Sequence, residues 1–286
     1  MSDAYMGNTE LGATKAVLIS ALVQRELAFN AILKNTITDV SNFAVPGVKQ
    51  ISFPKLTSFS VANRSEGVLG ETTALTSSVD NLDLNFSAYV SWGIDAFTAK
   101  QSTIDSQMQA ISFASRAQAR YVDTQIITKL AAVAASFINT GSDVDVTYAN
   151  LLAMRKAILK ADGNLADCVI IASPAQEAVL MGLSEFKDAA AYGANAVVPN
   201  GVIGKILGIP CIVHNGLADK QLFLYEKSAL VIGFQKQAEY GEQSFLELGV
   251  GAKKCAIDQY FGIAGQQLAL KGAASGKSPL VVGLND

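Results

Sequence analysis

Apolar and polar residues alternate strictly over residues 82–91 (LDLNFSAYVS). Alternate side chains of a strand point to the same face, so this pattern predicts a half-buried β-strand. Residues 48–61 are also rich in β-forming side chains, and residues 62–71 (ANRSEGVLGE) supply turn residues. Two strands around a glycine-containing turn predict a long β-hairpin over residues 48–91. A projecting hairpin is only marginally stable alone, so we expect it to rest on a partner surface.

A different period follows, because apolar residues recur at steps of three and four between Ile104 and Ile138 with no Gly or Pro among them. This period predicts a single helix, about 50 Å long at 1.5 Å per residue. A coiled coil is the alternative. The stripe is rich in alanine and has few flanking charge pairs, which favours packing on a sheet.

Shorter elements alternate over residues 147–234. A helix is predicted from Thr147 to Lys160, and a second helix begins at Ser173-Pro174, where serine is a favourable N-cap and proline a favourable first residue. Further predictions are strands at 168–172, 209–214 and 221–225, a turn at Asn215-Gly216, a short element at 227–230 and a loop at 186–200.

The two ends of the chain flank this α/β unit and a β-rich stretch. Residues 1–45 predict an arm that is part helical, over 16–33, and part extended. Residues 231–271 predict strands, including alternation at Leu246, Leu248 and Val250. Residues 272–286 contain Gly and Ser, and we expect them to be loosely held.

Composition adds one constraint: hydrophobic residues make up 50% of the chain and charged residues only 16%, with a mean hydropathy of +0.29. Soluble domains usually carry about 25% charged residues. The longest apolar runs are far shorter than the roughly 18–20 residues that a bilayer requires, and residues 1–10 do not resemble a signal peptide. We therefore expect a soluble chain that buries apolar surface between subunits.

Candidate chemistry is sparse. Basic residues are scattered and the net charge is −3, which is atypical of dedicated nucleic-acid binding. Glycine-rich segments at 201–205, 249–254 and 272–278 each miss a required position of a phosphate-binding motif. We predict no catalytic residue, no cofactor and no metal site. Several acidic residues lie on β-rich sequence, where a solvated strand face is favoured and a carboxylate pair stays open: Glu239, Glu242, Glu247 and Asp258.

Histidine and cysteine usage points the same way. The only histidine, His214, is interpreted as a strand-end or turn residue, because a partnership with Cys211 would place the two on opposite faces of one strand. Three widely spaced cysteines at 168, 211 and 255 form neither a disulfide framework nor a zinc pattern. They suit a reducing cytoplasm and are expected to be small buried hydrophobes. The only tryptophan, Trp92, is expected to pack in the core or at an interface.

The order of these elements resembles the major capsid protein of tailed bacteriophages, which has the Hong Kong 97-like fold. Residues 202–217 (VIGKILGIPCIVHNGL) and 222–230 (LFLYEKSAL) carry the closest likeness. The matching residues are Gly204, Gly208, Pro210, Asn215, Leu217, Lys227, Ser228 and Ala229.

That resemblance implies an α+β fold with an N-terminal arm (1–47), an extended hairpin loop (48–91), a peripheral domain with a long spine helix (92–145 and 235–275), an axial α/β domain (146–234) and a C-terminal tail (276–286). It also implies a virion structural protein that self-assembles as pentamers and hexamers into an icosahedral shell around double-stranded DNA. Partners would be copies of itself, with scaffolding, portal and decoration proteins, and no membrane. Assembly would occur in the host cytoplasm.

In such a shell the hairpin would lie over a neighbouring subunit. The residues expected at this interface are apolar anchors and charged rim residues: Phe53, Lys55, Phe59, Arg64, Glu66 and Glu71. An encapsulin-type nanocompartment shell, which resembles the same fold, is the first alternative. An α/β enzyme using the 186–200 loop and a tail or other virion protein are the others.

Overall fold

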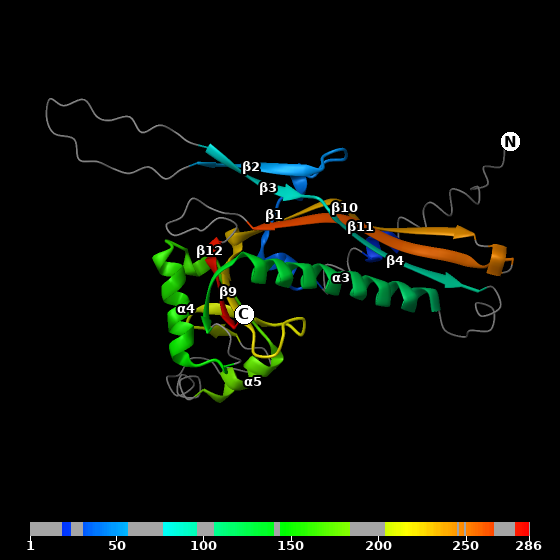
Figure 1. The fold of residues 1–286 in the computed structure, drawn as a ribbon. Helices are drawn as coiled ribbons and strands as arrows, with labels where there is room; N and C mark the ends of the chain where they lie inside the picture. Colours follow the sequence, from blue (N-terminus) through cyan, green and yellow to red (C-terminus); the bar gives the residue numbers. More distant parts are fainter. Residues whose placement is uncertain are drawn as a thin grey trace, which may run out of the picture.

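The predicted β-rich segments form a long, narrow sheet, which Figure 1 shows running along one side of the subunit. The structure is a computed structural model and describes residues 19–23, 31–56, 77–95, 106–139, 144–183, 204–244, 246–248, 250–265 and 278–285. The strands of the long sheet are, in spatial order, β1 (Thr38–Asp39), β10 (Leu230–Ser244), β11 (Lys253–Gly265) and β4 (Phe86–Ile94). Strand β11 pairs antiparallel with both of its neighbours.

Helix α3 (Ser106–Val133) lies along one face of the long sheet (Figure 1). Its apolar stripe is buried, and the Gln118 side chain donates a 2.9 Å hydrogen bond from Nε2 to the carbonyl oxygen of Ile257 on β11. The prediction that this helix packs on a sheet is therefore confirmed.

The helix ends earlier than the sequence period predicts. Residues 134–138 are not helical but belong to strand β5 (Ala134–Asn139), which follows α3 directly. No local breaker marks the change. The segment becomes a strand because residues from the far end of the chain pair with it between Ala134 and Asn139, with a register shift between Ser278 and Val282.

A six-stranded sheet stands at one end of α3. Its strands are, in spatial order, β5, β12 (Ser278–Asn285), β9 (Leu222–Glu226), β6 (Cys168–Ala172), β8 (Ile209–Val213) and β7 (Lys205–Ile206). Alternate residues of β6 pack into different clusters, because Ile170 faces the helices α4 (Tyr148–Lys160) and α5 (Pro174–Gly182) whereas Ile171 faces α3. The 3₁₀ turn η3 (Leu165–Asp167) leads into β6.

The predicted helix starts are confirmed in atomic detail. The Thr147 hydroxyl accepts a hydrogen bond from the Asn150 amide, and the Ser173 hydroxyl accepts one from the Gln176 amide. Buried Gln176 then accepts from the Val146 amide, so the second cap also holds the chain entering α4. The prediction of a loop at 186–200 lies outside the described residues.

The expectation that the C-terminal stretch is loosely held is wrong. Strand β12 is buried along its whole length and lies between β5 and β9. Its apolar run pairs parallel to β5 and antiparallel to β9, and such two-sided burial suits a continuous apolar segment better than an alternating one.

The hairpin also differs from its predicted form. Strand β2 (Gln50–Leu56) pairs with β3 (Ser77–Asp83), whereas residues 86–94 form β4 in the long sheet. The alternating segment 82–91 is thus split at Leu84 and Asn85 between two sheets. A period of two identifies strands but does not identify their partners.

Short 3₁₀ turns complete the fold: η1 (Leu33–Thr36), η2 (Ser41–Phe43), η5 (Lys227–Ala229) and η6 (Leu246–Leu248). The turn η5 confirms the short element predicted at 227–230. The turn η6 contradicts the strand predicted at 246–250, because the chain reverses there and Gly251 takes a positive φ of 100°. Of the arm helix predicted over 16–33, the structure describes helical residues at 19–23.

A truncated chain ending at Lys277 tests the role of β12. Four apolar side chains of β12 are fully buried, and burial of each contributes about 1.5–3 kcal/mol, a sum comparable to the total stability of a domain, about 5–15 kcal/mol. We expect the truncated chain to be insoluble or unfolded by circular dichroism. A control chain ending at Asn285 should unfold at the same temperature as the full chain. A folded Lys277 truncation would show that β12 is dispensable.

Candidate assembly surfaces

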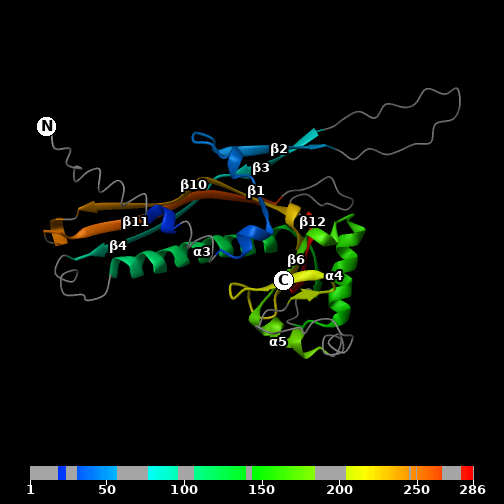
Figure 2. The same cartoon turned by 180° about the vertical axis from the view of Figure 1, so that it is seen from behind.

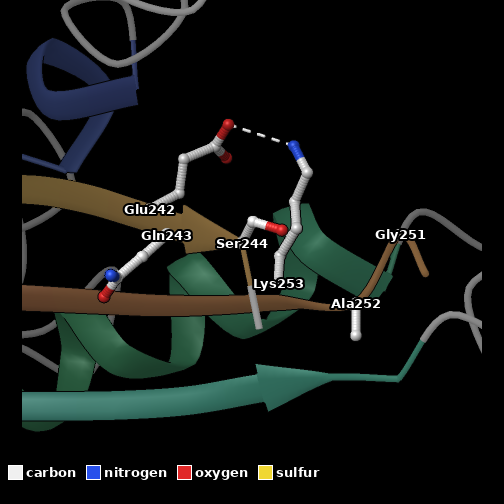
Figure 3. A pocket seen from close by; sticks show the side chains of 6 residues that line it. All are labelled: Glu242, Gln243, Ser244, Gly251, Ala252 and Lys253. Atoms are coloured by element: carbon white, nitrogen blue, oxygen red, sulfur yellow. Dashed lines mark hydrogen bonds and ion pairs between the residues drawn. The ribbon is translucent and has the colours of Figure 1, made fainter. Parts of the chain in front are cut away.

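The described part of the chain offers surfaces rather than a compact chemical site. It contains no group of three or more His, Cys, Asp or Glu side chains placed to hold a metal ion. No helix described here is long and apolar enough to cross a membrane. Figure 3 shows a shallow groove of about 210 Å³ between β10 and β11, crossed by a 3.0 Å ion pair between Glu242 and Lys253. Ligand pockets usually measure about 300–1,000 Å³, so this groove is small for one.

Beside the groove, the turn between β10 and β11 presents an apolar tip. Leu246 is 73% exposed and Val250 is 89% exposed, at the far end of the long sheet (Figure 1). The Glu242–Lys253 ion pair joins the two strands just before this turn. The turn therefore leaves two large aliphatic side chains in solvent, and we treat this tip as a candidate contact surface.

A second surface is the hairpin of β2 and β3, which lies on the face of the long sheet opposite α3 (Figures 1 and 2). Its root rests on two glycines that face each other across β10 and β11, Gly233 and Gly262. A Cβ atom at Gly262 would overlap the carbonyl oxygen of Asp83, and one at Gly233 would lie 3.1 Å from Leu82 Cδ2. The absence of side chains there lets the hairpin cross the sheet closely and sets its direction.

Arm residues protect the outer edge of β10. The Val40 amide donates a 2.8 Å hydrogen bond to the carbonyl oxygen of Ile232. Further along β10, the hydroxyls of Ser41 and Ser20 accept hydrogen bonds from the amides of Phe234 and Tyr240, each at 3.0 Å. An uncovered edge strand readily pairs with other chains, and these contacts occupy backbone amides of β10 that would otherwise be open to such pairing.

A buried polar contact joins the arm, α3 and the six-stranded sheet. Nε2 of His214 lies 3.2 Å from Oδ2 of Asp123, and Oδ1 of Asp123 accepts a hydrogen bond from the Leu33 amide. The Gly216 amide donates to Nδ1 of His214 at 2.9 Å, so neutral His214 carries its proton on Nε2 and donates to Asp123. The prediction of a turn histidine is confirmed.

Sequence reasoning missed the carboxylate partner of that histidine. Asp123 is the single acidic residue of α3 and lies among the buried positions of its stripe. A lone acidic residue on the apolar face of a helix requires a buried partner. The position of Asp123 in that stripe is the sequence signal that could have identified it. Close by, the Tyr225 hydroxyl is hydrogen-bonded to Thr36 of the arm, and burial raises the pKa of that tyrosine.

The cysteines and the tryptophan are packing residues. All three cysteines are buried and free, which confirms the prediction that they act as small hydrophobes. Burial raises the pKa of the Cys168 and Cys211 thiols to about 12, assisted by the charges of Glu226 and Glu177 respectively. Half-buried Trp92 packs against Tyr240, with ring centroids 6.2 Å apart.

Two of the acidic residues singled out by sequence share one cation. Lys236 Nζ lies 2.9 Å from a carboxylate oxygen of Glu239 and 2.9 Å from one of Asp258. Partial burial lowers the pKa of Lys236, but the hydrogen bonds that its ammonium donates to the two carboxylates, and their negative charges, outweigh burial and raise the pKa overall. The carboxylates therefore take part in ion pairs on the strand surface, as expected of a solvated strand face.

The structure describes only part of the expected hairpin interface. Phe53 is half-buried and packs on the cluster of Val40, Ile51 and Leu82 at the hairpin root. Lys55 lies on β2, with its Cα opposite Ser78 of β3. The remaining four residues lie outside the described residues: Phe59, Arg64, Glu66 and Glu71. Sequence reasoning missed the apolar tip; the signal there was Leu246 and Val250 beside glycines 249 and 251.

This arrangement of a long sheet, a spine helix, a projecting hairpin and an axial α/β sheet is the Hong Kong 97-like fold, as predicted. No family model and no curated protein matches the chain in sequence. Solved structures do match it.

A structure from Mycobacterium phage Che8 has a TM-score of 0.70 at 14% identity, covering 89% of this chain and 90% of that one. The capsid structure of cyanophage P-SCSP1u has a TM-score of 0.70 at 12% identity, covering 90% and 88%. A virus-like particle from Pyrococcus furiosus has a TM-score of 0.61 at 10% identity, covering 94% and 99%.

Replacing Gly262 by alanine tests the glycine support of the hairpin. The new methyl group would meet the backbone of β3, and overpacking of this kind costs about 1–3 kcal/mol. We expect a lower urea midpoint and faster protease cleavage of the hairpin. The matched control is Gly241→Ala on the neighbouring strand β10, where a Cβ meets no atom within 4 Å. Equal behaviour of the two variants would contradict the proposed crossing.

Thiol reactivity tests the burial of the cysteines. At pH 8 a thiol with a pKa of about 12 is roughly one part in 10⁴ thiolate, the reactive form. We expect no cysteine of the native chain to react with Ellman's reagent within an hour, and all three to react in guanidinium. The exposed substitution Val250→Cys serves as a positive control. Rapid labelling of a native cysteine would place it at an accessible site.

Proposed function

We propose that this chain is the major capsid protein of a tailed bacteriophage. It would self-assemble as pentamers and hexamers into an icosahedral shell that encloses double-stranded DNA. The observation that carries the proposal is the likeness of fold over about 90% of both chains to a cyanophage capsid structure. A likeness that covers about nine tenths of each chain supports a shared architecture over most of the subunit.

The exposed features of the subunit support the same function. The apolar tip at Leu246 and Val250 lies at one end of the long sheet, and strands β2 and β3 lie over the face of that sheet opposite α3 (Figure 1). Contacts between different patches on neighbouring copies close into rings and shells, and symmetry multiplies modest interfaces. A shell also accounts for the low charge, since little surface stays free after assembly.

The proposal carries the expected partners with it. The hairpin would lie over a neighbouring copy, with Phe53 and Phe59 as apolar anchors and rim ion pairs from Lys55, Arg64, Glu66 and Glu71. Scaffolding, portal and decoration proteins would assist assembly in the host cytoplasm. The mature subunit would reside in the virion, would require no cofactor and would have no catalytic role.

A nanocompartment shell that encloses protein cargo is the second candidate. It is favoured by the match to the Pyrococcus furiosus virus-like particle, which covers 99% of that chain. The gene neighbourhood separates the two: a portal and a terminase gene indicate a phage, and a cargo enzyme gene indicates a nanocompartment. Tubes or open rings of the purified protein would instead indicate a tail or other virion component.

Negative-stain microscopy and sedimentation of the purified full-length chain test the proposal directly. We expect capsomers and closed shells of uniform diameter. A chain that sediments as a monomer at every concentration and ionic strength would overturn the proposal. Catalytic turnover by such a monomer would revive the enzyme alternative.

Substitution of the apolar tip gives a sharper test. We expect L246S/V250S to retain the unfolding temperature of the parent, because both side chains are exposed, yet to raise the concentration needed for shell assembly at least about tenfold. The control L246M/V250I keeps the tip apolar and should assemble normally. Normal assembly of the serine variant would show that the tip lies outside every interface.

A further inference from the structure

The solvent face of α3 carries positive charge without any acid. Its exposed residues include Phe113, Arg116, Arg120, Tyr121, Thr124 and Thr128. The single acidic residue of the helix, Asp123, is buried against His214 and the Leu33 amide. Its charge is therefore used inside the subunit and is not available to the two arginines.

The arginines of this face have no ion-pair partner within the described part of the chain. Half-buried Lys220 pairs with Asp145 and half-buried Lys253 with Glu242, whereas Lys156 and Lys160 of α4 are exposed and, like the arginines, have no ion pair within the described residues. The hydroxyls of Thr124 and Thr128 donate back to the helix, to the carbonyl oxygens of Arg120 and Thr124. The guanidinium groups of Arg116 and Arg120 are thus the charges that this face presents.

The position of the face separates it from the proposed contacts between subunits. In both views the hairpin lies on one side of the long sheet and α3 on the other (Figures 1 and 2). The arm also contacts β10, at the root of the hairpin. If the hairpin side of the sheet makes the proposed contacts between subunits, the α3 side is the one that we assign to the interior of the shell.

We propose that the solvent face of α3 contacts the phosphate backbone of the enclosed double-stranded DNA through Arg116 and Arg120. This inference rests on the proposed capsid function and deepens it. Residues four apart rise about 6 Å along a helix, and each DNA strand carries a phosphate about every 3.4 Å along its axis. Two flexible arginines on one helix face can thus reach two phosphates of one strand. The planar guanidinium also suits bidentate phosphate contacts.

Such a contact is weak in one subunit and is summed over the copies in a shell. The contact is independent of the DNA sequence, because phosphate groups are the same for every base. A weak and repeated contact allows DNA to move during packaging, which agrees with the net charge of −3 and the absence of a strongly basic wall. An acidic segment of a protein partner is the competing occupant, and the experiment below separates it from DNA.

The test measures binding of a fluorescent 20-base-pair duplex to dissociated full-length subunits by anisotropy, with subunit concentrations raised to about 1 mM, because non-specific dissociation constants reach about 10⁻⁴ M. Neutralising two phosphates predicts that affinity falls about tenfold between 50 and 200 mM salt. We expect R116Q/R120Q to lose most of the binding and most of this salt dependence. The control K156Q/K160Q removes the same charge from exposed lysines of α4 and should bind as the parent does. R116K/R120K keeps the charge and should retain most of the affinity.

Three results would overturn the inference. One is unchanged duplex binding by R116Q/R120Q, or no binding by the parent chain at 50 mM salt. Another is an equal loss in both glutamine pairs, which would indicate net charge alone. The third is tighter binding of polyglutamate of matched charge than of the duplex, which would indicate an acidic protein partner.

Microscopy of the same preparations separates this inference from the proposed function. Because the arginines lie away from the tip and the hairpin, R116Q/R120Q is expected to form shells with the parent's diameter and unfolding temperature. If shells form and R116Q/R120Q binds the duplex as tightly as the parent chain does, only the proposed DNA contact is wrong. If the parent chain forms no shells under any condition, the capsid function fails and the inference fails with it.

Discussion

The architecture depends on the pairing of the last strand of the chain with the strand that ends the spine helix. Strand β5 is the edge of the six-stranded sheet and reaches the other strands only through β12. Because β5 continues directly from α3, the β12 pairing fixes the long helix relative to that sheet. The contact between Asp123 and His214 adds a second link from the same helix and also holds the arm at Leu33. These two links join the long sheet, the spine helix and the six-stranded sheet into one unit.

Local signals predicted most elements correctly and long-range pairing was the part they missed. The caps at Thr147 and Ser173 act within three residues, so the sequence contained everything needed to place α4 and α5. Residues 134–139 and 278–285 each depend on the other, and neither segment carries a local sign of that pairing. The hairpin shows the same limit, since its strands were recognisable but β2 pairs with β3 and not with residues 86–91.

The surfaces proposed for function were harder to predict than the core. Buried residues recur with the period of a helix or a strand, so the sequence pattern identifies them. An exposed residue that contacts another molecule has no such pattern and cannot be identified in this way. Leu246 and Val250 continue an apolar alternation in the sequence, and only the turn at η6 shows them to be exposed together. Arg116 and Arg120 belong to an ordinary polar helix face, and only the burial of Asp123 leaves that face without an acid. In the proposed shell, the apolar tip would contact a neighbouring subunit and the sparse cationic face of α3 would contact the contents.

The central claim is that this chain is a shell subunit whose exposed apolar extremities become buried on assembly. The most direct measurement is a cryo-electron microscopy reconstruction, at side-chain resolution, of particles formed by the full-length chain. The account predicts a closed icosahedral shell in which Leu246 and Val250 are covered by a neighbouring subunit and the hairpin lies over another. Particles that leave both residues in solvent, or the absence of closed particles, would contradict it.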